Sequence, residues 1–165
     1  MTATEDFAAS LNLSMSGWNK AMGLRFVSAT ADEVVAELEI GPVHRQPYGI
    51  VHGGVHAGVI ETVTSTGAAL HALKVGRSVV GLENHTSFLK AAREGFLRVT
   101  ALPVSRGRST QVWEARVTDA EGRLLATGRV RTFTLEAGSD VGGKAISSAP
   151  AAEPAPCAAG ADDRA

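Results

Sequence analysis

Several residue types on which whole classes of protein depend are scarce in this sequence. Cysteine occurs once among 165 residues, at Cys157, which excludes a disulfide within the chain and argues against a zinc site built from cysteines. No apolar run is long enough to cross a bilayer, so no membrane partner is expected. The N-terminal segment lacks the basic and apolar regions of a signal peptide. We therefore expect a cytoplasmic protein.

Aromatic side chains and net charge are scarce as well. Aromatic residues make up 5% of the chain and the formal net charge is −1, so nucleic acid is not an expected partner. Basic residues are concentrated between positions 77 and 135, which hold ten basic and five acidic side chains. They alternate with apolar residues, as on the solvated outer faces of strands. They would equally suit a ligand that carries several phosphates.

The end of the chain, from Ala137 to Ala165, consists mainly of Ala, Gly, Pro and Ser. Such a stretch buries too little apolar surface to offset the entropy lost on ordering. We predict one folded domain over residues 1–136 and a disordered tail over 137–165, which includes Cys157.

The folded part contains one long helix and several strands. One or two short helices, broken near Gly17 and Gly23, should precede a half-buried strand over residues 33–40, where apolar and acidic side chains alternate. Apolar residues three and four apart predict a helix over 52–73. Its core-facing stripe comprises Val55, Val59, Val63, Thr66, Leu70 and Leu73. Four strand-like segments follow, with spacers too short for a crossover helix, so they should pair antiparallel. This order predicts an α+β architecture.

The long helix opens on His52, Gly53 and Gly54. The first N–H groups of a helix have no partners within it, and with the helix dipole they attract an anion or a developing oxyanion. Glycines there let a ligand approach the backbone, or they simply serve a tight turn. His52 and His56 are spaced like the zinc pair of metalloproteases. Because Gly53 replaces the glutamate of that motif, no metal site is expected.

Glu61 is the only acidic residue of this helix, which has no Lys or Arg before position 74. Its face otherwise carries small uncharged residues: Ala57, Ser65, Ala68 and Ala72. A solvated helix face normally carries several charges, so we expect another surface to cover this one and leave Glu61 partly buried as a functional candidate. An exposed or paired glutamate without function is the alternative. Ser65 lies one turn further on and can orient the carboxylate or a water.

The spacing between His52 and Glu61 constrains any shared reaction. Nine residues of helix span roughly 13–14 Å and end half a turn away. The helix N-terminus and Glu61 of one chain therefore cannot act on the same atom. If both serve one reaction, they come from two chains, and packing about a twofold axis would also explain the small residues.

Two segments, HRQPYGIVHGGVHAGVIET at 44–62 and ENHTSFLKAAREG at 83–95, resemble the hotdog-fold acyl-CoA thioesterases. With Glu on the helix, together with HRQP and NHTSF, the chain looks most like the 4-hydroxybenzoyl-CoA thioesterases of the Arthrobacter type. The phenylacetate-pathway thioesterases, which typically carry Asp there, are near relatives. The resemblance covers roughly residues 17–135. It implies a hotdog fold, a long helix wrapped by a curved antiparallel sheet, in dimers that pair into tetramers.

The resemblance also implies catalytic residues. The backbone N–H of Gly53 would polarise the thioester carbonyl, with Gln46 near that oxygen. Glu61 of the neighbouring subunit would act as nucleophile or general base, and Ser65 stands where relatives have a Thr that helps to hold the water. His52 is a further candidate. His52, His56 and Tyr48 can each hydrogen-bond a ring hydroxyl or simply pack.

For the CoA phosphates the resemblance implies basic and hydroxyl side chains, namely Lys90, Arg106, Arg108, Ser109 and Thr110. Lys90 stands where an Arg is expected, which puts bidentate phosphate binding at that position in doubt. CoA is part of the substrate, so no cofactor is expected.

Thioester hydrolysis fits the residues themselves. It passes through an oxyanion that a helix N-terminus can stabilise, and a carboxylate can attack the acyl carbon or activate water. An aromatic acyl group, such as 4-hydroxybenzoyl, rests on the resemblance alone. A hydratase or dehydratase of acyl thioesters that uses His56 or His85 is one alternative. A non-catalytic acyl-CoA binder is the other.

Overall fold

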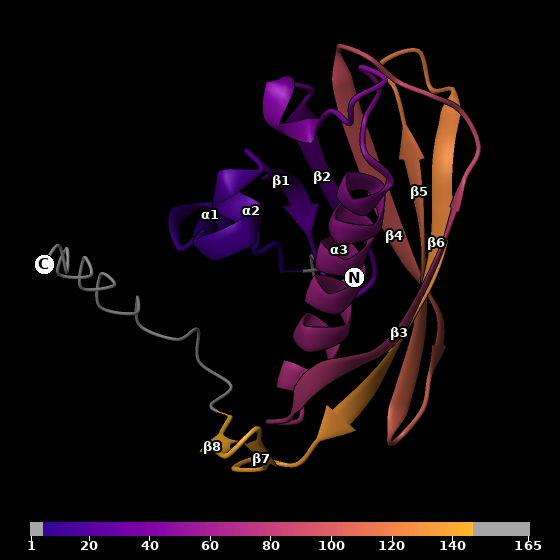
Figure 1. The fold of residues 1–165 in the computed structure, drawn as a ribbon. Coiled ribbons are helices and arrows are strands. Elements are labelled where there is room, and N and C mark those ends of the chain that lie inside the picture. The colour runs from indigo at the N-terminus through magenta and orange to yellow at the C-terminus, as the bar shows by residue number, and fades with distance from the viewer. Residues whose placement is uncertain (1–4, 147–165) are drawn as a thin grey trace, which may run out of the picture.

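The computed structural model describes residues 5–146, in which a curved antiparallel sheet wraps around one long helix (Figure 1). This is the predicted α+β class. The helices are α1 (Ala8–Leu13), α2 (Gly17–Ala21) and α3 (Gly53–Leu73), with a 3-10 turn η1 (Pro42–His44). The strands of the main sheet are β1 (Arg25–Ala29), β2 (Val34–Glu39), β3 (Ser78–Phe88), β4 (Phe96–Arg106), β5 (Thr110–Thr118) and β6 (Leu124–Leu135).

The strand order of the six-stranded sheet is β1-β2-β4-β5-β6-β3. All neighbouring strands pair antiparallel, which confirms the predicted pairing mode of the last four. The order is not sequential, however, because β3 pairs with β6 and not with β4. β1 and β3 are consequently the two edges of the sheet. The β3 edge runs beside α3, which brings residues of that strand to the middle of the helix (Figure 1).

Two helix glycines set the close packing of α3. A Cβ atom at Gly67 would lie 2.5 Å from the ring of Trp113, a fully buried side chain of β5. A Cβ atom at Gly58 would lie 2.5 Å from the ring of Trp18 on α2. The helix is thus packed between the sheet on one side and α2 on the other (Figure 1).

The buried surface of α3 is broader than the predicted stripe. Val55, Val59, Val63 and Leu70 are buried as predicted, whereas Thr66 is half-buried and Leu73 is 44% exposed. Positions outside the stripe are also buried, namely His56, Ile60, Thr64, Gly67, Ala68 and Ala72. Ala68 and Ala72 belong to the small-residue face that another surface was expected to cover. The predicted stripe was too narrow for His56, Ile60, Thr64 and Gly67, because the curved sheet contacts α3 through five of its strands.

The half-buried strand predicted over 33–40 is confirmed as β2, with Val34, Ala36 and Leu38 buried. The predicted short helices are confirmed as α1 and α2. None of the described helices has the length and apolar character needed to span a membrane.

The first part of the predicted tail contains secondary structure, while the division into a domain over 1–136 and a disordered tail over 137–165 stays a prediction. Two short strands, β7 (Asp140–Val141) and β8 (Lys144–Ala145), form a hairpin. Gly142 and Gly143 between them both have positive φ, which a two-residue hairpin turn requires. Cys157 and the rest of the tail lie outside the described residues.

Candidate active site

The N-terminus of α3 is organised around His52. Its Nδ1 accepts a hydrogen bond from the backbone N–H of Gly54 at 2.9 Å, so the ring caps the helix. An imidazole that accepts at Nδ1 carries its proton on Nε2. The backbone N–H of Gly53, the first helical residue, has no partner among residues 5–146. The Nε2–H of His52 and the backbone N–H of Gly53 are thus available to a ligand.

Gly53 also lies close to Phe88 of β3. A Cβ atom at Gly53 would lie 2.9 Å from the Phe88 ring. Glycine at this position therefore lets the Phe88 ring lie against the helix terminus, in addition to any role in binding.

A groove of about 530 Å³ opens at this end of α3. Its walls are mainly apolar, and its polar groups come from four predicted site residues, Gln46, His52, Gly53 and Lys90, together with His56 and the backbone of Gly54. An apolar groove with a few converging polar groups is the usual form of a small-molecule site. The structure therefore brings together the predicted oxyanion residues and one predicted phosphate ligand.

Glu61 lies further along α3 and is half-buried. Its Oε1 accepts a hydrogen bond from Ser65 Oγ at 3.0 Å, and its Oε2 accepts one from Asn84 Nδ2 at 3.0 Å. Asn84 Nδ2 also donates to the carbonyl oxygen of Ala57 at 3.1 Å, while Asn84 Oδ1 accepts from Thr86 Oγ1 at 2.7 Å. The carboxylate is thus oriented from both the helix and strand β3.

Asn84 belongs to the NHTSF segment, but its contact with Glu61 was not predicted. Nothing in the sequence indicates that Asn84 lies beside Glu61, because this contact depends on β3 crossing the middle of α3. Strand β3 also bulges between Gly81 and Glu83, which changes which side chains point toward the helix.

The small residues around Glu61 have an explanation within one chain, contrary to our expectation. A Cβ atom at Gly81 of β3 would lie 2.8 Å from Glu61 Oε1. Asn84 reaches Ala57, and the carbonyl oxygen of Ala68 accepts from the buried Gln111 of β5 at 3.1 Å. These small residues therefore do not require a covering subunit, which stays a prediction. The length of helix between Gly53 and Glu61 still keeps the two from acting on the same atom within one chain.

The groove and Glu61 do not meet in a single chain. The groove is lined by residues 46, 50–54, 56 and 88–91, and Glu61 is not among them. Eight helical residues, roughly 12 Å of axis, separate Gly53 from Glu61. One chain thus presents the two halves of a candidate site separately.

The remaining predicted phosphate ligands lie at the opposite end of α3. A cavity of about 240 Å³ is lined there by His71, Arg77, Arg106, Arg108 and Thr134, among others. Arg106 is already engaged: it donates to the carbonyl oxygen of Ala31, pairs with Asp32 at 2.8 Å and lies 5.5 Å from the Trp113 ring centroid. Its hydrogen bond holds the pKa of Asp32 below the usual value.

Ser109 and Thr110 lie at the turn between β4 and β5. The carbonyl oxygen of Thr110 accepts from the N–H of Gly107, and that of Ser109 accepts from the N–H of Thr134, each at 2.8 Å. A 21-residue helix, roughly 30 Å long, separates this turn from Lys90. The five predicted phosphate residues are therefore divided between the two ends of α3.

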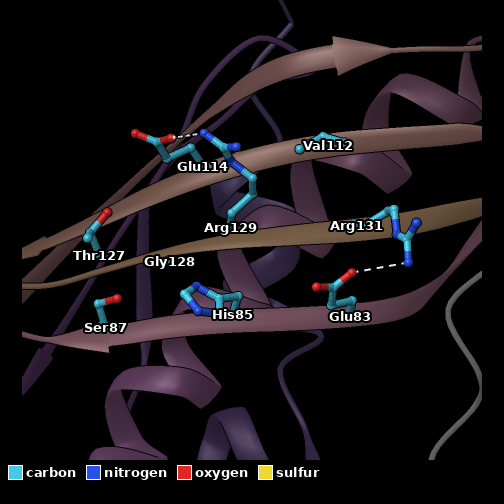
Figure 2. A pocket seen from close by; sticks show the side chains of 9 residues that line it. All are labelled: Glu83, His85, Ser87, Val112, Glu114, Thr127, Gly128, Arg129 and Arg131. Carbon is cyan, nitrogen blue, oxygen red and sulfur yellow. Dashed lines mark hydrogen bonds and ion pairs between the residues drawn. The ribbon is translucent and has the colours of Figure 1, made fainter.

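The histidines of the hydratase alternative do not reach Glu61. Among residues 5–146 the side chain of Glu61 is hydrogen-bonded only by Ser65 and Asn84. His85 follows Asn84 on β3, so it points to the opposite face of the sheet. Figure 2 shows it there between the ion pairs Glu83–Arg131, at 3.1 Å, and Glu114–Arg129, at 3.0 Å.

Comparison with known proteins identifies the family. The sequence model described as Thioesterase superfamily matches residues 48–126. A Mycobacterium tuberculosis protein, provisionally named esterase Rv1847, is 37% identical over 139 residues, covering 83% of this chain and 99% of that one. The 1,4-dihydroxy-2-naphthoyl-CoA hydrolase of Listeria monocytogenes is 34% identical over 113 residues, covering 68% and 91%.

Comparison with solved structures agrees with the sequence comparison. The S. sahachiroi protein AziG is 41% identical with a TM-score of 0.71, covering 73% of this chain and 98% of that one. Thioesterase HI1161 of Haemophilus influenzae is 28% identical with a TM-score of 0.74, covering 78% and 90%. The fold is therefore the predicted hotdog fold.

The chain belongs to the thioesterase superfamily. It is accordingly an enzyme, a thioester hydrolase, as predicted. The resemblance to hotdog-fold thioesterases is therefore confirmed. The relatives named above carry names other than 4-hydroxybenzoyl-CoA thioesterase, so the resemblance to that particular enzyme stays a prediction.

Proposed function

We propose that this protein hydrolyses an acyl-CoA thioester to the free acid and CoA. The observation that carries the proposal is the Glu61 carboxylate, which has a hydrogen-bond donor on each oxygen and lies on a helix with no other acidic residue. Two donors fix the orientation of a carboxylate without neutralising it, which suits a nucleophile or a general base.

In the proposed reaction the thioester carbonyl oxygen binds at the N-terminus of α3. The unpartnered N–H of Gly53 donates to it, with His52 Nε2–H and the Gln46 side chain beside it in the groove. These donors stabilise the oxyanion that forms when the acyl carbon is attacked. In the direct route Glu61 takes a proton from the attacking water, the C–S bond breaks, and that proton leaves on the CoA thiol. In the covalent route the Glu61 carboxylate attacks the acyl carbon, the C–S bond breaks to release CoA as the thiolate, which is protonated from solvent, and water then cleaves the acyl-enzyme anhydride to the free acid and the Glu61 carboxylate.

The Glu61 that serves a given groove comes from a neighbouring subunit. The separation along α3 supports this, since one chain cannot bring its own Glu61 to its own groove. β3 supports it too, because it is an eleven-residue edge strand whose outer side is unpaired in the single chain, and Leu82 on it is 52% exposed. Such an edge is a ready surface for another strand. We propose a dimer that buries both β3 edges, and a pair of such dimers as the full assembly.

CoA phosphates would bind to basic side chains that are not already engaged in ion pairs. Lys90 lines the groove, Arg108 lines the second cavity, and neither makes an ion pair within the described part of the chain. Arg106 is a weaker candidate because Asp32 already neutralises it. Ser109 and Thr110 complete the proposed set at the β4–β5 turn. No cofactor takes part, since CoA arrives as part of the substrate.

For the acyl group we propose an aromatic ring. The groove wall is formed by Ile50, Val51, Phe88 and Leu89, a surface suited to a flat apolar group. Candidate substrates are 4-hydroxybenzoyl-CoA, from the sequence resemblance, and 1,4-dihydroxy-2-naphthoyl-CoA, from the name of the Listeria relative.

Release of free thiol from acyl-CoA substrates tests the proposal. We expect turnover by the wild type and a loss of roughly a hundredfold or more in kcat for Glu61→Gln, in the range of general acid–base effects. Glu39→Gln is the matched control, since Glu39 is exposed on β2. No thiol release by the wild type would overturn the proposed hydrolysis, and equal turnover by Glu61→Gln and wild type would overturn the role of Glu61. Hydration of crotonyl-CoA without thiol release would instead support a hydratase.

A further inference from the structure

His56 is a buried histidine that the proposed reaction leaves without a role. It lies one turn beyond His52 on α3, is 4% exposed and borders the groove at the helix N-terminus. Its Nδ1 is fully buried and has no hydrogen-bond partner among residues 5–146. Burial lowers the pKa of His56, which keeps the ring neutral at neutral pH.

The missing partner indicates where the proton of His56 resides. A buried N–H without an acceptor is rarer in proteins than a buried lone pair without a donor. The favoured tautomer therefore keeps the lone pair on the buried Nδ1 and the proton on Nε2. Nε2 has no hydrogen-bond partner within the described residues either, and it is not among the fully buried unpartnered atoms. This leaves one N–H donor on the part of the ring that is accessible.

The surroundings of this donor are apolar. The Phe88 ring lies 6.2 Å from the His56 ring, centroid to centroid, at an interplanar angle of 41°. Val51, Phe88 and Leu89 form the adjoining wall of the groove. A lone donor in such a wall is costly when it has no partner, so it selects ligands that supply an acceptor.

We infer that His56 is a specificity-determining residue that donates a hydrogen bond from Nε2 to an oxygen on the acyl group of the substrate. The thioester carbonyl is assigned to Gly53 and His52, so the oxygen left for His56 is a hydroxyl or keto oxygen of the acyl group. The enzyme then favours oxygenated acyl groups over their deoxy analogues. The inference rests on the proposed acyl-CoA hydrolysis and narrows its substrate class.

Matched substrate pairs test the inference. One pair is 4-hydroxybenzoyl-CoA and benzoyl-CoA; the other is 1,4-dihydroxy-2-naphthoyl-CoA and 2-naphthoyl-CoA. Thiol release gives kcat/KM for each, in the wild type and in His56→Leu, which has a similar volume and no donor. For at least one pair we expect the wild type to prefer the oxygenated member by about tenfold or more. In His56→Leu the preference should fall to about one, with kcat/KM for the deoxy member changed by less than about threefold.

Two further variants identify the nitrogen. The side-chain amide of His56→Gln reaches the position of Nε2, and that of His56→Asn reaches the position of Nδ1. The Gln variant should retain more of the preference than the Asn variant. This comparison also carries the test if His56→Leu does not fold, which its thermal unfolding would reveal.

The outcomes separate the two proposals. Equal loss for both members of a pair, or an unchanged preference in His56→Leu, overturns the role of His56 while leaving acyl-CoA hydrolysis in place. The role of His56 is also overturned, and hydrolysis left in place, if the wild type hydrolyses acyl-CoA but prefers neither member of either pair. No thiol release by the wild type from any of the four substrates overturns the proposed function and this inference together.

Discussion

Replacing Asn84 with alanine isolates the contribution of strand β3 to the Glu61 carboxylate. The substitution removes the 3.0 Å hydrogen bond to Glu61 Oε2 and the 3.1 Å bond to the Ala57 carbonyl. The bond from Ser65 to Oε1 is retained. The carboxylate therefore keeps its place on the helix but loses the donor that fixes its second oxygen.

The size of the effect follows from the kind of bond that is lost. A hydrogen bond to a charged group contributes about 1.5–3 kcal/mol. Asn84 is exposed, so water replaces part of this interaction and the lower end applies. About 1.4 kcal/mol corresponds to tenfold in rate. We expect kcat to fall about tenfold in Asn84→Ala, with KM little changed, because the carboxylate acts on the reaction and not on binding.

The assay is thiol release from an acyl-CoA that the wild type hydrolyses. His85→Ala is the matched control: His85 is the next residue on β3 and points to the other face of the sheet. It should retain nearly full activity. Wild-type kcat in Asn84→Ala would refute the reasoning, and an equal loss in His85→Ala would show that disturbance of the strand, not the lost donor, causes the effect.

Three other predictions follow from the packing and the site. Gly67→Ala should lower the urea midpoint, because its Cβ meets a fully buried indole at 2.5 Å and overpacking costs about 1–3 kcal/mol. Gly58→Ala meets the partly exposed indole of α2, which can move, and a smaller loss is expected; equal losses would contradict this. Mixing Glu61→Ala with Gly53→Ala chains should restore about a quarter of wild-type activity, since half of randomly paired dimers then hold one intact site; no recovery after exchange would argue against a shared site. Lys90→Ala should raise KM about fivefold for an acyl-CoA but not for the acyl-pantetheine thioester, a loss of ~1 kcal/mol; equal effects on both would exclude phosphate binding at this residue.

The sequence by itself was sufficient to predict most of the local elements. The long helix was predicted within one residue of α3, because apolar spacing and the glycines at its start are properties of neighbouring residues. The last four strands and the strand β2 followed from alternation in the same way. Glu61 stood out because a lone carboxylate on a helix of small residues conflicts with an ordinary solvated face. The hairpin after residue 139 was missed, although its paired glycines are a turn signal that the composition of the tail obscured.

What the tertiary structure decided is which residues meet. Nothing local places β3 beside β6, and this placement brings Asn84 to Glu61 and Phe88 to Gly53. It also decided that α3 is packed on two sides, which buries His56 next to the groove. Contacts of this kind depend on strand register and on the closing of long loops, which are set by the whole core and not by the neighbours of a residue. The residue types that carry the chemistry of the site could therefore be predicted from the sequence. The orientation of the Glu61 carboxylate and the shape of the groove could not, because they depend on how the sheet closes around the helix.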